Sequence, residues 1–297
     1  MQILLTGGTG LIGSGLVRQW QQQHKLIVLS RQKEKVSAMF GPDVTGIDNL
    51  NQVDFNQLDA VVNLAGEPIV GKRWTAQQKQ RLCNSRWDIT RQLVSAIKQA
   101  TTPPKVLISG SAVGIYGRQH NQRITEDFEH YHAEFSHLLC QRWESLAEEA
   151  SSAATRVCLI RTGIVLSTEG GALKKMLLPF KLGLGGKIGS GQQYMSWIHY
   201  SDMLALIDFL LHHPTLSGAF NATAPTPVTN TEFSKTLAKV LHRPCLLPMP
   251  APVLQLMLGE MADLLTTGQC VIPANLRKAG FDFSYTELEP ALRSLLR

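Results

Sequence analysis

The feature that most constrains the fold is a glycine-rich turn near the start of the chain. The residues TGGTGLIG occupy positions 6–13, with glycines at 7, 10 and 13. An apolar run over Gln2–Leu5 precedes the turn, and apolar residues at helical spacing follow it: Leu11, Ile12, Leu16, Val17 and Trp20. A glycine in a regular element costs roughly 0.5–1 kcal/mol relative to alanine, so this density of glycine indicates a specific use.

A strand that leads through G-x-x-G-x-x-G into a helix is typical of dinucleotide binding. Gly7 permits the tight turn, Gly10 lets the backbone approach a pyrophosphate, and Gly13 lets the helix pack closely against the strand. The helix N-terminus offers free N–H groups and the positive end of its dipole to that pyrophosphate. The alternative is a glycine-rich turn without a ligand, which the strand–turn–helix register disfavours.

Further buried-type strands alternate with long helical patterns. The strands are KLIVLS (25–30), DAVVNLAG (59–66), KVLISGSA (105–112) and RVCLIRTGIVL (156–166). The helices cover roughly 75–100, with Leu82, Ile89, Leu93 and Ile97 on one face, and roughly 130–150. This alternation predicts an α/β fold with a Rossmann-type doubly wound parallel sheet, which binds ligands beyond the carboxyl ends of its strands.

The composition changes after about Leu166, where Gly-rich and Pro-rich stretches interrupt the chain. We therefore expect a dinucleotide-binding domain over 1–166, to which segment 199–222 returns, and a smaller C-terminal substrate-binding lobe, mainly over 167–297. A helix is expected over 201–212, with Ser201 or Asp202 as its N-cap.

Charge, cysteine content and hydropathy exclude several kinds of ligand and partner. The 29 Lys+Arg and 23 Asp+Glu give a net charge of +6, with the basic residues scattered, so nucleic-acid binding is not expected. Five widely spaced cysteines without C-x-x-C argue against a disulfide framework or a metal site and favour a reducing cytoplasm. No apolar window is long enough for a membrane helix, so no membrane partner is expected.

The end of the second strand indicates which cofactor binds. An NAD site usually has an acidic residue there to bind the ribose 2′-hydroxyl. This chain has Ser30 and Arg31 instead, and a guanidinium can grip a 2′-phosphate with two hydrogen bonds. NADP(H) is therefore favoured over NAD. The alternative is that Arg31 is only a solvated charge on a loop.

At this point the sequence resembles the extended branch of the short-chain dehydrogenase/reductase superfamily. The similar motifs are TGGTGLIG, NLAG (63–66), SGSAVGIYG (109–117) and WIHYSDM (197–203). It is most similar to a subgroup called epimerase-family proteins, which also have a segment like LPFKLGLGGKIGSGQQYMSWIH and a similar C-terminal module. The resemblance implies a small carbonyl or hydroxyl substrate, with a nucleotide sugar as one option, and a homodimer.

The same resemblance implies a set of cofactor-binding residues. Gly7, Gly10, Leu11, Ile12 and Gly13 would meet the pyrophosphate, and Ser30 and Arg31 the 2′-phosphate. The residues implied for the ribose and its surroundings are Leu64, Ala65, Gly66, Glu67 and Arg86.

One departure concerns the chemistry itself. The superfamily uses Tyr-x-x-x-Lys on the helix after its Ser strand, and alignment with that pattern places Cys140 and Glu144 there. An anionic Glu144 would raise the pKa of a neighbouring thiol, so this pair cannot do the same work. The remaining catalytic candidates are Ser111, Tyr116 and Cys140, with Tyr131 also conceivable.

Two residues are candidates for contacting the substrate. Lys187 lies in a Gly-rich segment that could close over a ligand, and His199 precedes the 201–212 helix. Two functions therefore stay open: an NADP-dependent oxidoreductase or epimerase, and a sensor that binds NADP(H) without catalysis.

Overall fold

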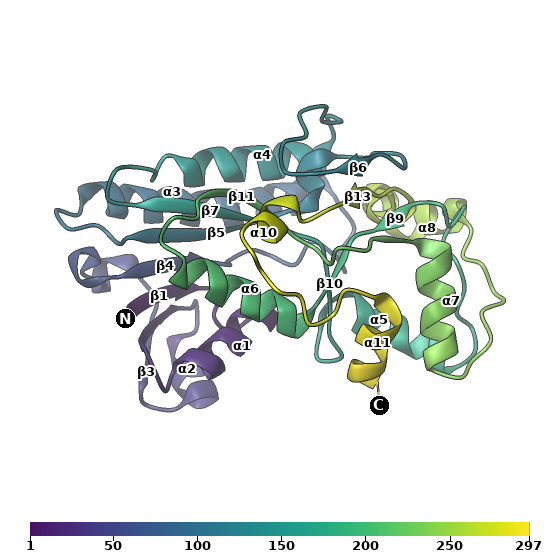
Figure 1. Cartoon of the computed structure of the whole chain (residues 1–297), viewed down its shortest axis with the longest axis horizontal. Helices are drawn as coiled ribbons and strands as arrows, with labels where there is room; N and C mark the ends of the chain where they lie inside the picture. Colours follow the sequence, from purple (N-terminus) through teal and green to yellow (C-terminus); the bar gives the residue numbers. More distant parts are fainter. Residues whose placement is uncertain (297) are drawn as a thin grey trace.

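The computed structural model describes residues 1–296 and centres on a seven-stranded parallel sheet (Figure 1). The strand order is β11-β7-β5-β4-β1-β2-β3. The strands are β1 (Gln2–Thr6), β2 (Lys25–Leu29), β3 (Val44–Ile47), β4 (Ala60–Asn63), β5 (Val106–Ala112), β7 (Arg156–Thr162) and β11 (Gly218–Ala222). The order reverses beside β1, which creates a crevice at the carboxyl ends of β1 and β4. This sheet confirms the predicted Rossmann-type fold.

Helices cover both faces of the sheet because successive strand residues point to opposite sides. In β1, Ile3 and Leu5 pack in one core with α1 (Leu11–Trp20), α2 (Lys33–Phe40) and α6 (Tyr200–His212). Leu4 packs in the other core with α3 (Ala76–Gln99) and α4 (Phe135–Glu148). Figure 1 shows these two layers below and above the sheet.

A smaller lobe lies at one end of the molecule around its own apolar core (Figure 1). Its helices are α5 (Gly171–Lys181), α7 (Asn230–Val240), α8 (Ala251–Leu258), α9 (Asp263–Thr266) and α11 (Leu288–Leu296), and α10 (Ala274–Lys278) contacts β11. Short strands pair as β6 (Arg123–Ile124) with β13 (Cys270–Val271), β8 (Ile164–Leu166) with β10 (Trp197–His199), and β9 (Tyr194–Met195) with β12 (Val228–Thr229). The 3-10 turns are η1 (Leu50–Gln52), η2 (Phe55–Gln57), η3 (Val113–Tyr116) and η4 (Gly259–Ala262).

Two predicted elements differ from the structure. The strand predicted over 156–166 is split at Gly163, whose amide donates to the Ala222 carbonyl (3.1 Å), after which β8 leaves the main sheet and pairs with β10. The helix predicted from position 130 begins only at Phe135, because the preceding residues form a loop in which the His132 amide donates to the Tyr116 carbonyl (3.1 Å).

Within residues 1–296, no helix is long and apolar enough to cross a membrane. The same residues contain no group of three or more His, Cys, Asp or Glu side chains arranged to hold a metal ion. All five cysteines are unpaired, and four of them are buried.

Candidate functional site

The glycine turn between β1 and α1 leaves almost no room for side chains. Gly7 has a φ of +70°, which glycine adopts readily, and a Cβ there would lie 2.5 Å from the Leu64 carbonyl oxygen. A Cβ on Gly13 would collide with the Gly7 carbonyl and lie 2.7 Å from Gly8 Cα. The missing side chains therefore let α1 start directly against the carboxyl ends of β1 and β4.

The first turn of α1 presents unpaired amides beside Gly10. Gly10 is the extended N-cap, and a Cβ there would approach only one atom within 4 Å, a backbone oxygen at 3.2 Å. The first helical hydrogen bond runs from the Ser14 amide to the Gly10 carbonyl (2.9 Å). The amides of Leu11, Ile12 and Gly13 have no partner within residues 1–296, and the first turn carries no acidic residue. Such a helix end binds an anionic group.

The turn after β2 places a cation at the same edge of the sheet. The Ser30 hydroxyl accepts from the Gln32 amide (3.2 Å), which fixes the turn. Arg31 is exposed and forms no ion pair in the described chain, whereas nearby Lys33 pairs with Asp48 (3.4 Å). A free guanidinium at this edge can bind a phosphate.

The segment after β4 lies beside the glycine turn. The Leu64 amide donates to the Thr6 carbonyl (3.1 Å) and the Ala65 amide to the Thr6 hydroxyl (3.2 Å), so both residues are held against β1. The Lys72 hydrogen bond, and less strongly the charges of Lys72 and Arg31, keep the pKa of Glu67 below its usual value. The charge of Arg31 therefore acts on this segment.

Arg86 reaches the same segment from α3. Its guanidinium donates to the carbonyls of Glu67 and Leu82 (both 3.0 Å) and lies over the Trp143 ring, 5.3 Å from its centre. A Cβ on Gly66 would lie 2.9 Å from its guanidinium carbon, so glycine is needed for this close approach. Arg86 thus puts a half-buried positive charge behind the strand end, although burial lowers its pKa.

The predicted catalytic face of α4 contains a buried ion pair. The Glu144 carboxylate accepts two hydrogen bonds from the Arg161 guanidinium on β7 (3.0 and 2.9 Å) and one from the Ser111 hydroxyl (2.6 Å). All three side chains are buried. Because Ser111 already donates its proton to Glu144, its hydroxyl cannot also donate to a substrate carbonyl in this arrangement.

Tyr116 and Cys140 do not have the properties of acid–base catalysts. Tyr116 is fully buried; its hydroxyl donates to Asn221 (2.7 Å) and accepts from Arg161 (3.0 Å), and burial raises its pKa to about 12. Burial, and then the charge of Glu144, raises the pKa of Cys140 to about 12. Both groups stay protonated near neutral pH, and both are buried in the protein interior.

Sequence reasoning missed Arg161, whose guanidinium donates two hydrogen bonds to the Glu144 carboxylate. Its position inside the apolar run of β7 could have indicated it, because a charge there usually requires a buried partner.

His199 has a structural role at the start of α6. The predicted N-cap at Ser201 or Asp202 is wrong, because the His199 ring accepts a hydrogen bond from the Ser201 amide (3.1 Å). Its other ring nitrogen lies 3.2 Å from the Ser294 hydroxyl, and its ring centre lies 3.9 Å from that of Tyr285. Both nitrogens are used, so His199 offers none to a substrate.

Lys187 lies in an anchored loop of the small lobe. Its ammonium donates to the Ser190 carbonyl (3.3 Å) within the same loop. The loop is fixed by the Ile188 amide, which donates to the Asn230 side chain (2.7 Å), and by the Gly189 amide, which donates to Met249 (2.9 Å). These contacts hold the loop against α7 and segment 244–249.

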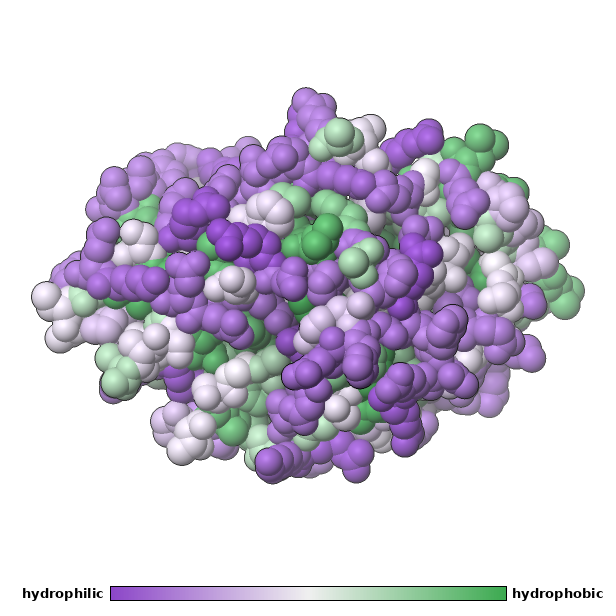
Figure 2. Space-filling view, turned by 90° about the horizontal axis from the view of Figure 1, so that it is seen from above, coloured by the Kyte–Doolittle hydropathy of each residue, from purple (hydrophilic) through white to green (hydrophobic). Residues whose placement is uncertain are grey.

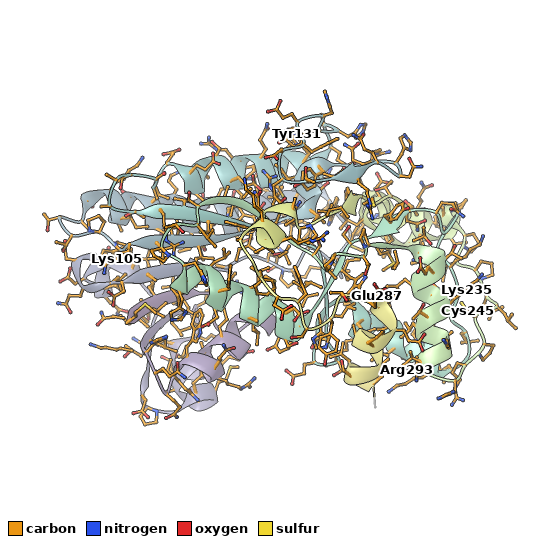
Figure 3. The ribbon with its side chains drawn as sticks, viewed as in Figure 1. Lys105, Tyr131, Lys235, Cys245, Glu287 and Arg293 are labelled. Carbon is orange, nitrogen blue, oxygen red and sulfur yellow. The ribbon has the colours of Figure 1, made fainter. Side chains whose placement is uncertain are left out.

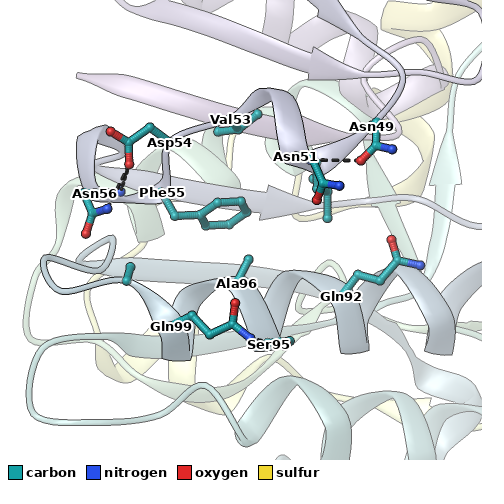
Figure 4. A pocket seen from close by; sticks show the side chains of 12 residues that line it. Asn49, Asn51, Val53, Asp54, Phe55, Asn56, Gln92, Ser95, Ala96 and Gln99 are labelled. Atoms are coloured by element: carbon teal, nitrogen blue, oxygen red, sulfur yellow. Dashed lines mark hydrogen bonds between the residues drawn. The ribbon is translucent and has the colours of Figure 1, made fainter.

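A surface cavity of about 440 Å³ lies elsewhere (Figure 4). It is lined by the connection between β3 and β4 and by the C-terminal half of α3, including Phe55, Gln92 and Gln99. None of the predicted site residues lines it, so we do not assign the cofactor to this cavity.

The family models divide the chain into two parts. Residues 3–222 match the NAD dependent epimerase/dehydratase family. Residues 249–295 match a domain of unknown function, DUF1731, which covers α8 to α11.

Relatives match the chain over its whole length. An epimerase family protein of Staphylococcus aureus (strain N315) is 36% identical, covering 100% of this chain and 99% of the relative. The epimerase family protein YfhF of Bacillus subtilis (strain 168) is 37% identical, covering 100% and 98%. Among solved structures, the human epimerase family protein SDR39U1 with NADPH is 35% identical, with a TM-score of 0.91 and 99% of each chain covered.

Proposed function

This chain belongs to the NAD dependent epimerase/dehydratase family, and we propose that it binds NADP(H) across the carboxyl ends of β1, β2 and β4. The observation that carries the proposal is the set of three unpaired amides on Leu11, Ile12 and Gly13 at the N-terminus of α1. These amides, with no side chain at Gly10 to obstruct them, suit a pyrophosphate. The human relative, solved with NADPH, supports the same choice of ligand.

Preference for the phosphorylated cofactor rests on Arg31. This guanidinium is exposed, has no carboxylate partner in residues 1–296, and follows the strand next to β1. A ribose 2′-phosphate would give it a partner with two negative charges, whereas a 2′-hydroxyl would not. Arg86 would add a second positive charge behind the segment that faces the ribose.

The Arg31→Asp variant tests this preference. We expect the affinity for NADPH to fall by roughly tenfold to a hundredfold, since a charge-assisted contact is lost and a repulsive charge is added. The affinity for NADH should change less than threefold. Titration of the nicotinamide fluorescence measures both, and Lys33→Asp, two residues along, is the matched control. Equal losses for the two cofactors would refute the assignment of the 2′-phosphate to Arg31.

We further propose that the bound cofactor serves an oxidoreductase or epimerase reaction on a small carbonyl or hydroxyl compound, with nucleotide sugars as one class to test. NADP(H) supplies the hydride chemistry when bound. The chain contributes binding and orientation, and the small lobe would hold the substrate. A turnover screen with NADPH over nucleotide sugars, aldehydes and ketones tests this function; a protein that binds NADPH but converts none of them would count against it.

The second candidate is a sensor that binds NADP(H) without catalysis. It is favoured by the buried contacts of Ser111, Tyr116 and Cys140, which leave no group of the usual kind to exchange a proton with a substrate. Transfer of deuterium from labelled NADPH to any compound by the wild-type protein would exclude this candidate directly.

A further inference from the structure

The small lobe carries an exposed apolar patch at the end of the molecule. Nine of the twelve large apolar residues that are exposed in residues 1–296 belong to it, and Leu256 and Leu246 are the most exposed at 80% and 76%. Figure 2 shows green, hydrophobic residues gathered at this end. We call this set the lobe patch: Leu178, Leu182, Leu184, Leu246, Leu247, Met249, Val253, Leu256 and Met257.

The segments that carry the lobe patch are hydrogen-bonded neighbours. The Met249 amide donates to the Lys187 carbonyl (2.8 Å) and the Leu247 amide to the Gly185 carbonyl (3.4 Å), so the loop after α5 runs beside segment 244–249. The Arg243 guanidinium donates to the carbonyl of Lys181, the last residue of α5 (2.8 Å). Helix α8 continues directly from this segment.

The two chain segments that carry the lobe patch are basic and contain no acidic residue, and Glu169, Glu232 and Glu260 lie just outside them. Segments 171–195 and 233–259 contain no Asp or Glu and seven basic residues: Lys174, Lys175, Lys181, Lys187, Lys235, Lys239 and Arg243. Figure 3 shows Lys235 and Cys245, the residue before Leu246, at this end of the molecule. Of the seven, Lys239 is neutralised by Glu289 of α11 (2.7 Å). Glu260, directly after the second segment, pairs with Lys79 of α3.

We propose that the lobe patch docks on an anionic lipid surface. Leucine and methionine side chains would enter the interface between headgroups and acyl chains, and the surrounding lysines and arginine would meet lipid phosphates. This proposal departs from the sequence-based expectation of no membrane partner, which rested on the lack of a membrane-spanning helix, because peripheral docking requires no such helix.

Charge and composition favour lipid over other occupants. A second copy of the chain would bring two patches of like charge together, with no acidic residue in either segment to compensate. Protein interfaces are enriched in Trp, Tyr and Arg at their centres, whereas leucine and valine are under-represented among the residues that dominate binding. The exposed apolar side chains of the lobe patch are all Leu, Met or Val.

Co-sedimentation of the full chain with vesicles tests the proposal. Vesicles of phosphatidylcholine containing phosphatidylglycerol should bind the protein, and added salt should weaken the binding because it screens the charges. Pure phosphatidylcholine vesicles should bind at least tenfold less. Absence of binding to the anionic vesicles, or equal binding to both kinds, would overturn the proposal.

Two variants and one control locate the surface. Leu246→Gln with Leu256→Gln should reduce vesicle binding about tenfold or more, since two apolar contacts are lost. Lys181→Gln with Lys235→Gln should give a similar loss that disappears at high salt. Leu138→Gln, which changes a leucine of α4 that is 55% exposed, should leave vesicle binding within twofold.

The remaining outcomes separate the alternatives. Unchanged vesicle binding by the double-leucine variant would overturn the proposal. The proposal would also be overturned if the wild-type chain formed a dimer in sedimentation equilibrium without lipid and the double-leucine variant did not. Urea unfolding of each variant checks its folding, and the vesicle assay uses no cofactor, so the test does not depend on the proposed function.

Discussion

At the scale of single residues, Gly10 and Gly13 lack side chains for different reasons. A Cβ on Gly13 would be forced into the backbone of the turn, whereas one on Gly10 would meet only the Gly7 carbonyl oxygen, at 3.2 Å. We expect Gly13→Ala to destabilise the fold by about 1–3 kcal/mol, the usual cost of overpacking. Gly10→Ala should cost less, about 1 kcal/mol, because a single tight contact needs a small shift of the turn. It should nevertheless weaken NADPH binding, because its methyl group would occupy the ligand's space.

Urea unfolding and NADPH titration of the two variants measure these effects. Equal destabilisation by both would show that Gly10 is also needed for packing. A Gly10→Ala variant with unaltered NADPH affinity would mean that the cofactor does not pass over this turn.

Residue chemistry was partly predictable from the sequence. The prediction that Glu144 raises the pKa of Cys140 is confirmed, although burial has the larger effect. The sequence could mark Arg161 as a buried charge, but its pairing with Glu144 was not predictable, because the two residues are 17 positions apart on a strand and a helix whose contact depends on the whole sheet. The N-cap of α6 was also missed, since a histidine ring can cap a helix as Ser or Asp does.

At the scale of secondary-structure elements, apolar runs predicted the strands well because a sheet buried on both faces needs continuous apolar sequence. The break at Gly163 was missed, because apolar residues resume directly after it in β8. What separates the two strands is a close approach: a Cβ on Gly163 would collide with the Ser196 carbonyl and meet Thr223 Cγ2 at 2.9 Å. The glycine itself was the local sign of this crowding.

The junction of α4 with β5 and β7 depends on the buried Glu144–Arg161 pair. Glu144→Gln would leave the Arg161 guanidinium buried without a counter-charge, so we expect a loss of about 3–5 kcal/mol in the free energy of unfolding. Replacing both residues, with Glu144→Gln and Arg161→Met, should recover much of that loss. Glu149→Gln at the end of the same helix breaks an exposed pair with Lys98 and should cost less than about 1 kcal/mol.

Urea unfolding of Glu144→Gln, Arg161→Met, the double variant and Glu149→Gln, with double-mutant analysis of the first three, gives these energies. Independent, additive effects of the Glu144 and Arg161 replacements would contradict the view that the pair acts as one unit. Glu144→Gln and the double variant also remove the carboxylate that accepts a hydrogen bond from the Ser111 hydroxyl. The activity of these two variants therefore reports on the role of Ser111.

At the scale of the whole molecule, the C-terminal segment is bound to the Rossmann domain through the start of α6. The Asp202 carboxylate accepts hydrogen bonds from the Ser284 and Tyr285 amides (both 3.0 Å), and His199 packs against Tyr285. In the sequence, this region resembles a family motif, WIHYSDM, but the motif does not show which residues Asp202 and His199 contact. They lie more than 80 residues away, so only the assembled fold brings them together.

The titration of His199 makes this connection sensitive to pH. Burial lowers the pKa of His199 to about 4, against an ordinary value of 6.5. As the pH falls from 6.5 to 4, the unfolded chain takes up a proton that the folded chain does not, so stability falls across this window. Above 6.5 neither state is protonated, and the stabilisation is fully present. We expect His199→Asn, which keeps a side-chain acceptor for the helix cap, to reduce this loss of stability.

Urea unfolding of the wild type and of His199→Asn at pH 7.0 and 5.0 measures the difference. Other groups titrate in both proteins: burial also lowers the pKa of His24, and it raises the pKa of Asp202, which acts in the opposite direction. Subtracting the two profiles removes these shared contributions and leaves that of His199. If the two proteins lose the same stability between pH 7.0 and 5.0, the His199 ring does not carry the pH dependence.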